Sequence, residues 1–139
     1  MADVTLTAGS VAAGTGAVII EGVAGETIAQ GKAVYLLAST NEYMLADCTD
    51  ADTDAAVGFA LTASIDGGPI RVQTGGNMTT AADLTAGVIY VLSESGLITP
   101  STDFAAAYDA LVIMGAATTT TNLMIPTSGP LVTSYGITG

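Results

Sequence analysis

The sequence predicts an all-β protein, folded as a small β-barrel or a two-sheet sandwich built from two weakly similar halves, with extended N- and C-terminal arms. Short runs of β-branched and apolar residues favour strands, whereas the helix formers Lys, Arg, Glu and Gln are scarce. Glycines, 17 in a chain of 139 residues, separate these runs. A similar series of runs recurs about 55 residues later.

The runs predict nine strands at a regular spacing, which is typical of barrels and sandwiches. Pro126 ends the last run, because proline cannot donate a hydrogen bond to a neighbouring strand. The expected strands are Val4–Thr7, Ala17–Gly22, Ala33–Ala38, Tyr43–Ala46, Ala56–Ala63, Ile70–Thr74, Val88–Leu92, Leu111–Ala117 and Asn122–Ile125.

Two short segments between these runs predict hairpin turns. They are Ala38–Glu42 and Asp66–Pro69, and the Asp-Gly-Gly of the second supplies the positive φ that tight turns demand. A one-turn helix is expected at Thr79–Leu84 or at Asp103–Tyr108.

The recurring runs predict one domain of two related halves. The segment Ile28–Leu37 is similar to Leu84–Leu92, and the two later strands of each half are similar in the same order. Chance similarity in a chain rich in Ala, Thr and Gly is the alternative explanation. The expected division is an N-terminal arm over 1–15, a single β domain over 16–127 with halves at about 23–76 and 77–127, and a C-terminal tail over 128–139.

The charge balance excludes several partners. The net charge is -11, and Lys32 and Arg71 are the only cations, so the chain cannot neutralise the phosphates of a nucleic acid. An anionic membrane surface would repel it. The N-terminus has neither a basic start nor a long apolar run, so we expect no signal peptide and no membrane span, but synthesis in the cytoplasm.

The sequence offers little for catalysis or for a cofactor. It has no histidine, and its single cysteine, Cys48, has no base in the chain that would activate it. Charged residues are only 11% of the chain, against about a quarter in ordinary soluble domains. We therefore expect no catalytic residues, no cofactor and no enzyme activity, and a surface of small residues that another protein can cover.

Carboxylates between two expected strands are the one candidate metal site. With Asp50 as the first position of a calcium loop, the sixth position is Ala55 rather than Gly, and the twelfth is Leu61 rather than Glu. A solvated acidic loop is the alternative. The candidate ligands are Asp50, Asp52 and Asp54, with Asp47 beside them.

The two cations and two tyrosines have structural and functional interpretations. Lys32 and Arg71 each fit a carboxylate network or an anchor in a protein interface, where arginine is enriched. Tyr35 and Tyr90 occupy matching positions of the repeat and are expected to be half-buried strand residues with the hydroxyl at the rim.

Five motifs follow one another along the chain: Gly25–Leu36, Tyr43–Asp47, Ala56–Ala60, Gln73–Gly76 and Gly87–Ser93. Their order and spacing resemble those of small phage capsid decoration (cement) proteins. The resemblance runs from about Val23 to Pro126. It implies a small β-barrel-like protein, often a trimer, that binds the outside of the expanded phage head and joins subunits of the major capsid protein; it implies no catalytic residues.

Other classes remain as alternatives. A head-fibre or other surface β-structural component would share the composition, although long repetitive arrays would favour it and this chain has two units. A calcium- or glycan-binding β module would need the Asp47–Asp54 loop to be a site. The expected location is the virion, on the outer capsid surface.

Overall fold

The computed structural model describes residues 4, 6–49, 53–81, 83–103, 110–126 and 129–134. These residues form an all-β fold, as predicted, in which all named strands pair in antiparallel fashion. Within these ranges the only helical turns are two 3-10 turns, Ala8–Ser10 and Ser101–Asp103. Over the same ranges, no helix has the length and apolar character needed to cross a membrane.

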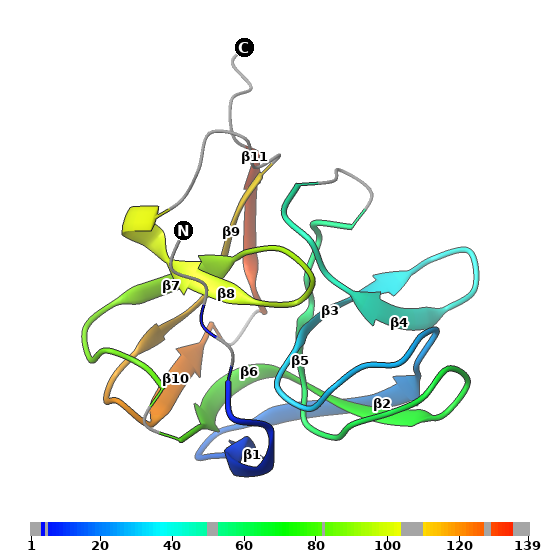
Figure 1. The fold of residues 1–139 in the computed structure, drawn as a ribbon, viewed down its shortest axis with the longest axis horizontal. Coiled ribbons are helices and arrows are strands. Elements are labelled where there is room, and N and C mark those ends of the chain that lie inside the picture. Colours follow the sequence, from blue (N-terminus) through cyan, green and yellow to red (C-terminus); the bar gives the residue numbers. More distant parts are fainter. Residues whose placement is uncertain are drawn as a thin grey trace.

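In the described part of the chain, eleven strands curl into one sheet, and Figure 1 shows two groups of strands joined along β6. The main strand order is β4-β3-β5-β6-β10-β9-β7-β8, while β1 and β2 pair with β6, and β11 pairs with β9. The strands are β1 Ala12–Ala13, β2 Val18–Val23, β3 Ala33–Leu37, β4 Glu42–Leu45, β5 Gly58–Ala60, β6 Pro69–Thr79, β7 Ile89–Leu92, β8 Ile98–Pro100, β9 Ala110–Ala117, β10 Asn122–Ile125 and β11 Leu131–Ser134.

The strand order is the same in the two parts of the chain. Read from its outer end, one part is β4-β3-β5-β6 and the other is β8-β7-β9-β10, and the two meet where β6 pairs with β10. The strands therefore correspond in the order in which the runs recur. The boundary expected at 76/77 lies within β6, so this strand belongs to both parts.

Two apolar cores lie on opposite faces of β3 and β5. Successive side chains of a strand point to opposite faces, and Tyr35 and Phe59 enter one core while Val34 and Ala60 enter the other. The larger core contains Leu6, Val11, Ala33, Tyr35, Ala46, Cys48, Ala56, Phe59, Leu61, Met78, Leu84, Tyr90, Leu92, Ile98, Val112, Met114, Ala117, Leu123 and Ile125. The smaller core contains Ala24, Ile28, Val34, Tyr43, Ala60, Ile70 and Val72.

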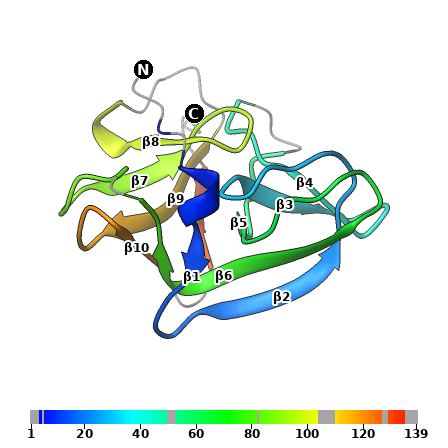
Figure 2. The ribbon, with the colours of Figure 1, turned by 60° about the horizontal axis from the view of Figure 1, so that its bottom comes forward.

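The strand β6 bends where it passes from one part to the other, and Figure 2 shows it running beside β2. Its first half pairs with β2 and β5, and its second half with β1 and β10. At the bend Gly76 has a φ of +84° and lies against the backbone of Gly16, where a side chain has no room. The buried Gln73 amide nitrogen donates to the carbonyls of Gly75 (3.0 Å) and Asn77 (2.7 Å). These bonds hold the bent backbone.

The N-terminal segment differs from the free arm expected over 1–15. In its described part the Val4 N–H donates to the Ile98 carbonyl at 2.7 Å, and Leu6 and Val11 are buried in the larger core. The apolar side chains expected to form a strand at 4–7 instead cover the open side of that core. The segment is part of the domain because burying these side chains is more favourable than exposing them.

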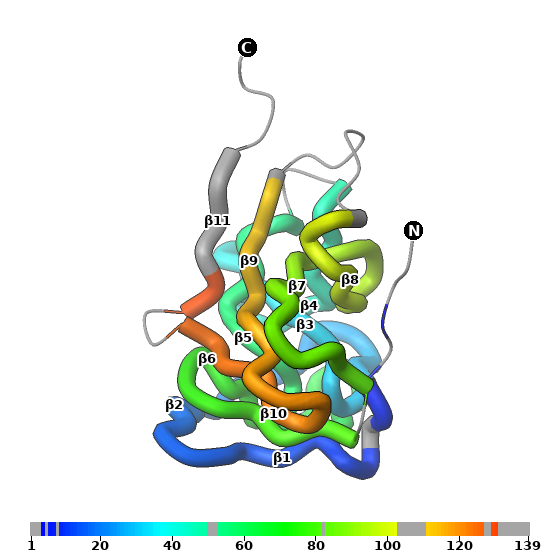
Figure 3. The backbone as a smooth tube through the Cα atoms, turned by 90° about the vertical axis from the view of Figure 1, so that its left-hand side faces the viewer, coloured from blue at the N-terminus to red at the C-terminus, as the bar shows by residue number. Residues whose placement is uncertain are grey.

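The C-terminal segment also contains a structural element. Within the tail expected over 128–139, Leu131–Ser134 forms β11, which pairs with Ala110–Ile113 of β9. Figure 3 shows β9 and β11 side by side. This long-range pairing has no counterpart in a local sequence pattern.

Both predicted hairpins are confirmed as antiparallel pairs. Asn41 has a φ of 60° in the β3–β4 turn, and Gly67 has a φ of 82° in the segment that connects β5 to β6. The one-turn helix expected at Thr79–Leu84 is wrong for its described residues, because β6 continues to Thr79. The alternative at Asp103–Tyr108 lies outside the described residues after Asp103.

Candidate interaction surfaces

Asp47 is a turn former within the acidic segment. Its Oδ1 accepts hydrogen bonds from the Thr49 N–H at 2.9 Å and the Thr49 hydroxyl at 2.6 Å, and its Oδ2 accepts one from the Ser95 N–H at 3.2 Å. This local side-chain bonding is typical of an Asx turn. The Oδ1 atom therefore shapes the segment after β4, and the Oδ2 atom joins this segment to the β7–β8 turn.

The three candidate calcium ligands are not all described. Asp54 is buried, whereas Asp50 and Asp52 lie outside the described residues. Among the residues that the structure describes, no group of three or more His, Cys, Asp or Glu could hold a metal ion. Calcium binding by this segment stays a prediction. Cys48 in the same segment is buried in the larger core.

Arg71 and Glu21 form an ion pair across two strands. They are cross-strand partners in β6 and β2, and the Arg71 Nε lies 3.4 Å from the Glu21 Oε2. The side chains are 52% and 75% exposed, so water screens the pair and its contribution to stability is about 0–1 kcal/mol. Arg71 thus meets one carboxylate, and both side chains remain available to a partner.

Lys32, the other cation, has different surroundings. It is partly buried just before β3, and its backbone carbonyl accepts a hydrogen bond from the Ala60 N–H at 2.8 Å. The Lys32 Cβ lies close to Gly96 of the β7–β8 turn, while Arg71 lies beside β2. The two residues predicted as interface anchors therefore belong to different parts of the surface.

The tyrosines of the repeat are more buried than expected. Tyr35 and Tyr90 both enter the larger core, and the Tyr90 hydroxyl accepts a hydrogen bond from the Thr85 N–H at 2.9 Å. Tyr43 enters the smaller core, where burial raises the pKa of its hydroxyl above the ordinary value. All three are structural residues of the sheet.

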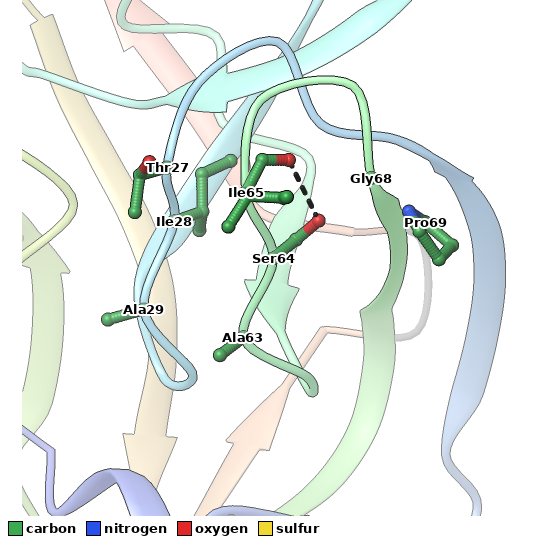
Figure 4. Close-up of a pocket in the computed structure, with 8 residues that line it drawn as sticks. All are labelled: Thr27, Ile28, Ala29, Ala63, Ser64, Ile65, Gly68 and Pro69. Carbon is green, nitrogen blue, oxygen red and sulfur yellow. Dashed lines mark hydrogen bonds between the residues drawn. The ribbon is translucent and has the colours of Figure 1, made fainter.

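Two open hollows lie side by side on the loops next to β2 and β6. The first has a volume of about 580 Å³ and is mainly apolar; its Ile65 is 70% exposed at the tip of the loop. Figure 4 shows how the loop of Thr27–Ala29 lies beside that of Ala63–Ile65. The second, of about 450 Å³, shares Ala63 and Pro69 with the first and extends to Glu21 and Arg71.

Large apolar side chains are exposed on several strands and on one loop, a feature that no sequence pattern predicted. The strand β2 carries three of them, of which Val18 is 44%, Ile20 37% and Val23 41% exposed. The same strand borders the second hollow through Glu21 and Gly22. Among the residues whose burial the structure describes, the set is Val18, Ile20, Val23, Leu36, Ile65, Ile89 and Met124.

Comparison of the chain with protein-family models, with curated proteins and with solved structures found no match. Its function is therefore inferred from its own residues and surfaces.

Proposed function

We propose that this chain is a non-catalytic virion structural protein that binds the outside of the phage head and stabilises the lattice of the major capsid protein. The observation that carries the proposal is the group of large apolar side chains left exposed on β2, namely Val18, Ile20 and Val23. Exposed apolar patches on a soluble domain mark surfaces that other proteins cover. The sequence resemblance to decoration proteins names the class of protein.

The proposed mechanism is linkage between binding and lattice stability. A protein that binds the mature lattice and not its dissociated subunits stabilises the lattice by mass action. Many copies on one shell add their modest interfaces, and contacts that join neighbouring subunits gain from multivalency. The proposal includes a homo-oligomer, with a trimer favoured, and neither nucleic acid nor membrane as a partner.

Charge supports a protein partner of opposite sign. The net charge of -11 repels anionic surfaces, and it speeds association with a basic surface at low ionic strength. The proposed site of action is the outer capsid surface, after synthesis in the host cytoplasm.

Co-sedimentation with phage heads tests the proposal. The protein is mixed with expanded heads that lack a decoration protein, and with unexpanded heads as the matched control. We expect saturable binding to the expanded heads and a higher melting temperature of those heads. Light scattering of the free protein gives its oligomeric state. Equal binding to both forms of the head, or binding without a change in melting temperature, contradicts the proposal.

A further inference from the structure

The strand β2 has an open edge over Val18–Glu21. Among the described residues, β6 is the one strand that pairs with β2 along this stretch. The Arg71 carbonyl accepts a hydrogen bond from the Leu61 N–H at 2.8 Å, so the backbone groups of Arg71 point away from β2. In an antiparallel pair, the backbone groups of its partner Glu21 then point away from β6. Two residues earlier in the strand, those of Ile19 also point outward.

Two other edge strands show how the fold covers an edge. On β4, the Tyr43 carbonyl accepts a hydrogen bond from the Gly25 N–H at 2.8 Å. The Leu45 N–H of the same strand donates to the Glu26 carboxylate, also at 2.8 Å. The Ile98 carbonyl of β8 accepts the Val4 N–H. Natural sheets cover or charge their edges because open ones pair with other chains. Among the described residues, no such cover lies over Val18–Glu21 of β2, and beyond it the Tyr43 ring packs on Gly22.

The side chains of β2 suit an added strand. Val18 and Ile20 are exposed on one face, and Val23 on the other, so an incoming strand finds apolar neighbours on both faces. The one charged side chain of β2, Glu21, contacts Arg71 through its Oε2 atom and stays 75% exposed beside the hollow lined by Ala63, Pro69 and Arg71. A carboxylate beside an apolar hollow fits a long cationic side chain, whose methylene stem packs while its charged end pairs.

We propose that the β2 edge binds an extended segment of a partner protein by strand addition, and that this segment carries a lysine or arginine opposite Glu21. Backbone hydrogen bonds to Ile19 and Glu21 supply the strand pairing, and the alternating side chains supply the selectivity. If the proposed function holds, the segment belongs to the capsid subunit.

Charge argues for such a partner over a second copy of this chain. Two copies paired through β2 would bring two net charges of -11 together and place both Glu21 side chains on one face of a short ladder. Like charges in a pair of strands are destabilising. A basic segment instead gains from the field of the whole molecule.

A peptide titration tests the site without a phage head. The probe is a capped peptide with alternating Val and Thr around a central Lys, titrated into 15N-labelled protein, and the control peptide has Glu in place of Lys. We expect the lysine peptide to shift the amide resonances of Ile19 and Glu21 most, and the glutamate peptide to leave them unchanged. Shifts concentrated elsewhere, or equal shifts with both peptides, would overturn the proposal.

Variants then separate this site from the proposed function. Glu21→Gln should weaken the lysine peptide several-fold, while Glu94→Gln, the same change at the exposed β7–β8 turn, should not. Val18→Thr combined with Ile20→Thr keeps β-branched residues and should weaken binding as well. If these variants bind expanded heads as tightly as the unchanged protein does, the β2 site is wrong and the decoration role stands. If the peptide binds at β2 but heads are not bound, the decoration role is wrong and the site stands.

Discussion

The ring of Tyr43 in β4 packs on the backbone of Gly22 in β2, so that a Cβ on Gly22 would lie 2.5 Å from the Tyr43 Cε2 atom. Next to this contact, the Gly25 N–H donates to the Tyr43 carbonyl at 2.8 Å. Together they close the end of β2 and the residues after it against β4.

Gly22→Ala should destabilise the protein by about 1–3 kcal/mol, because the added methyl group must displace the Tyr43 ring in a packed core. Urea denaturation measures the loss of free energy of unfolding. Gly9→Ala is the control, since a Cβ at Gly9 meets no atom within 4 Å. Equal effects of the two substitutions would show that the ring contact has no energetic role.

Comparing the stability losses of Gly76→Ala and Gly87→Ala separates the cost of a positive φ from the cost of steric crowding by a neighbouring backbone. The two glycines have nearly the same φ, +84° and +85°, but only Gly76 lies against another backbone segment, at Gly16. Gly87→Ala should cost about 1–2 kcal/mol, the price of a left-handed conformation for an L-residue. Gly76→Ala should cost clearly more, or prevent folding. Thermal unfolding of both variants checks the order, and a Gly76→Ala protein as stable as Gly87→Ala would refute the packing at the bend.

Gln30→Met should loosen the N-terminal segment. The Gln30 amide nitrogen donates to the carbonyls of Val11 (2.9 Å) and Leu61 (2.8 Å) and so joins this segment to the β5–β6 connection. Methionine has a similar shape but no donor, and each partly buried carbonyl left unpaired costs about 1–3 kcal/mol. We expect faster hydrogen exchange at the amides of Leu6–Ala13.

Gln73→Met is the matched control for that experiment, because the Gln73 amide also bridges two carbonyls, but within β6. It should lower the overall stability without selective loosening of the N-terminal segment. The same exchange pattern in both variants would mean that Gln30 has no local role.

Alkaline pH should destabilise the protein through Tyr43. Burial raises the pKa of the folded-state hydroxyl above its ordinary value of 10.0. The folded state thus holds the Tyr43 hydroxyl proton more tightly than the unfolded state does. The contribution of the protonated Tyr43 to stability is therefore complete below pH 10.0 and is lost as the pH rises through the folded-state pKa. Urea denaturation between pH 8 and pH 11 compares the protein with Tyr43→Phe. The variant should lose less stability over this range, and parallel losses would assign the alkaline effect to other groups.

The local patterns predicted strands well, and long-range pairing accounts for the differences. The apolar runs of β3, β7 and β10 appear where expected. The strand β8 was missed, because Ile98–Pro100 is short and ends in a proline that hides its pattern. The strand β6 was predicted to end at Thr74, just before Gly75 and Gly76. In the fold these glycines allow the close approach of Gly16 and the strand continues.

The candidate surface could be predicted only in part. The run VIIEGV predicts an apolar strand, but the sequence does not show that its outer edge stays open. That depends on segments far along the chain covering β4 and β8 instead. The role of Asp47, by contrast, was open to prediction, because Asp followed two residues later by Thr is a common Asx-turn signal.

The N-terminal segment has a consequence for the order in which the chain folds during synthesis. The Val4 N–H donates to the Ile98 carbonyl, and the Thr7 N–H donates to the Asp83 carboxylate at 2.9 Å. The N-terminal segment therefore cannot form these contacts until residues 83 and 98 have left the ribosome. Contacts of such high sequence separation slow folding, because the loop must close before they form. Until then the larger core is open on one side. The nascent chain should therefore depend most on chaperones while residues near 80–100 are still being made.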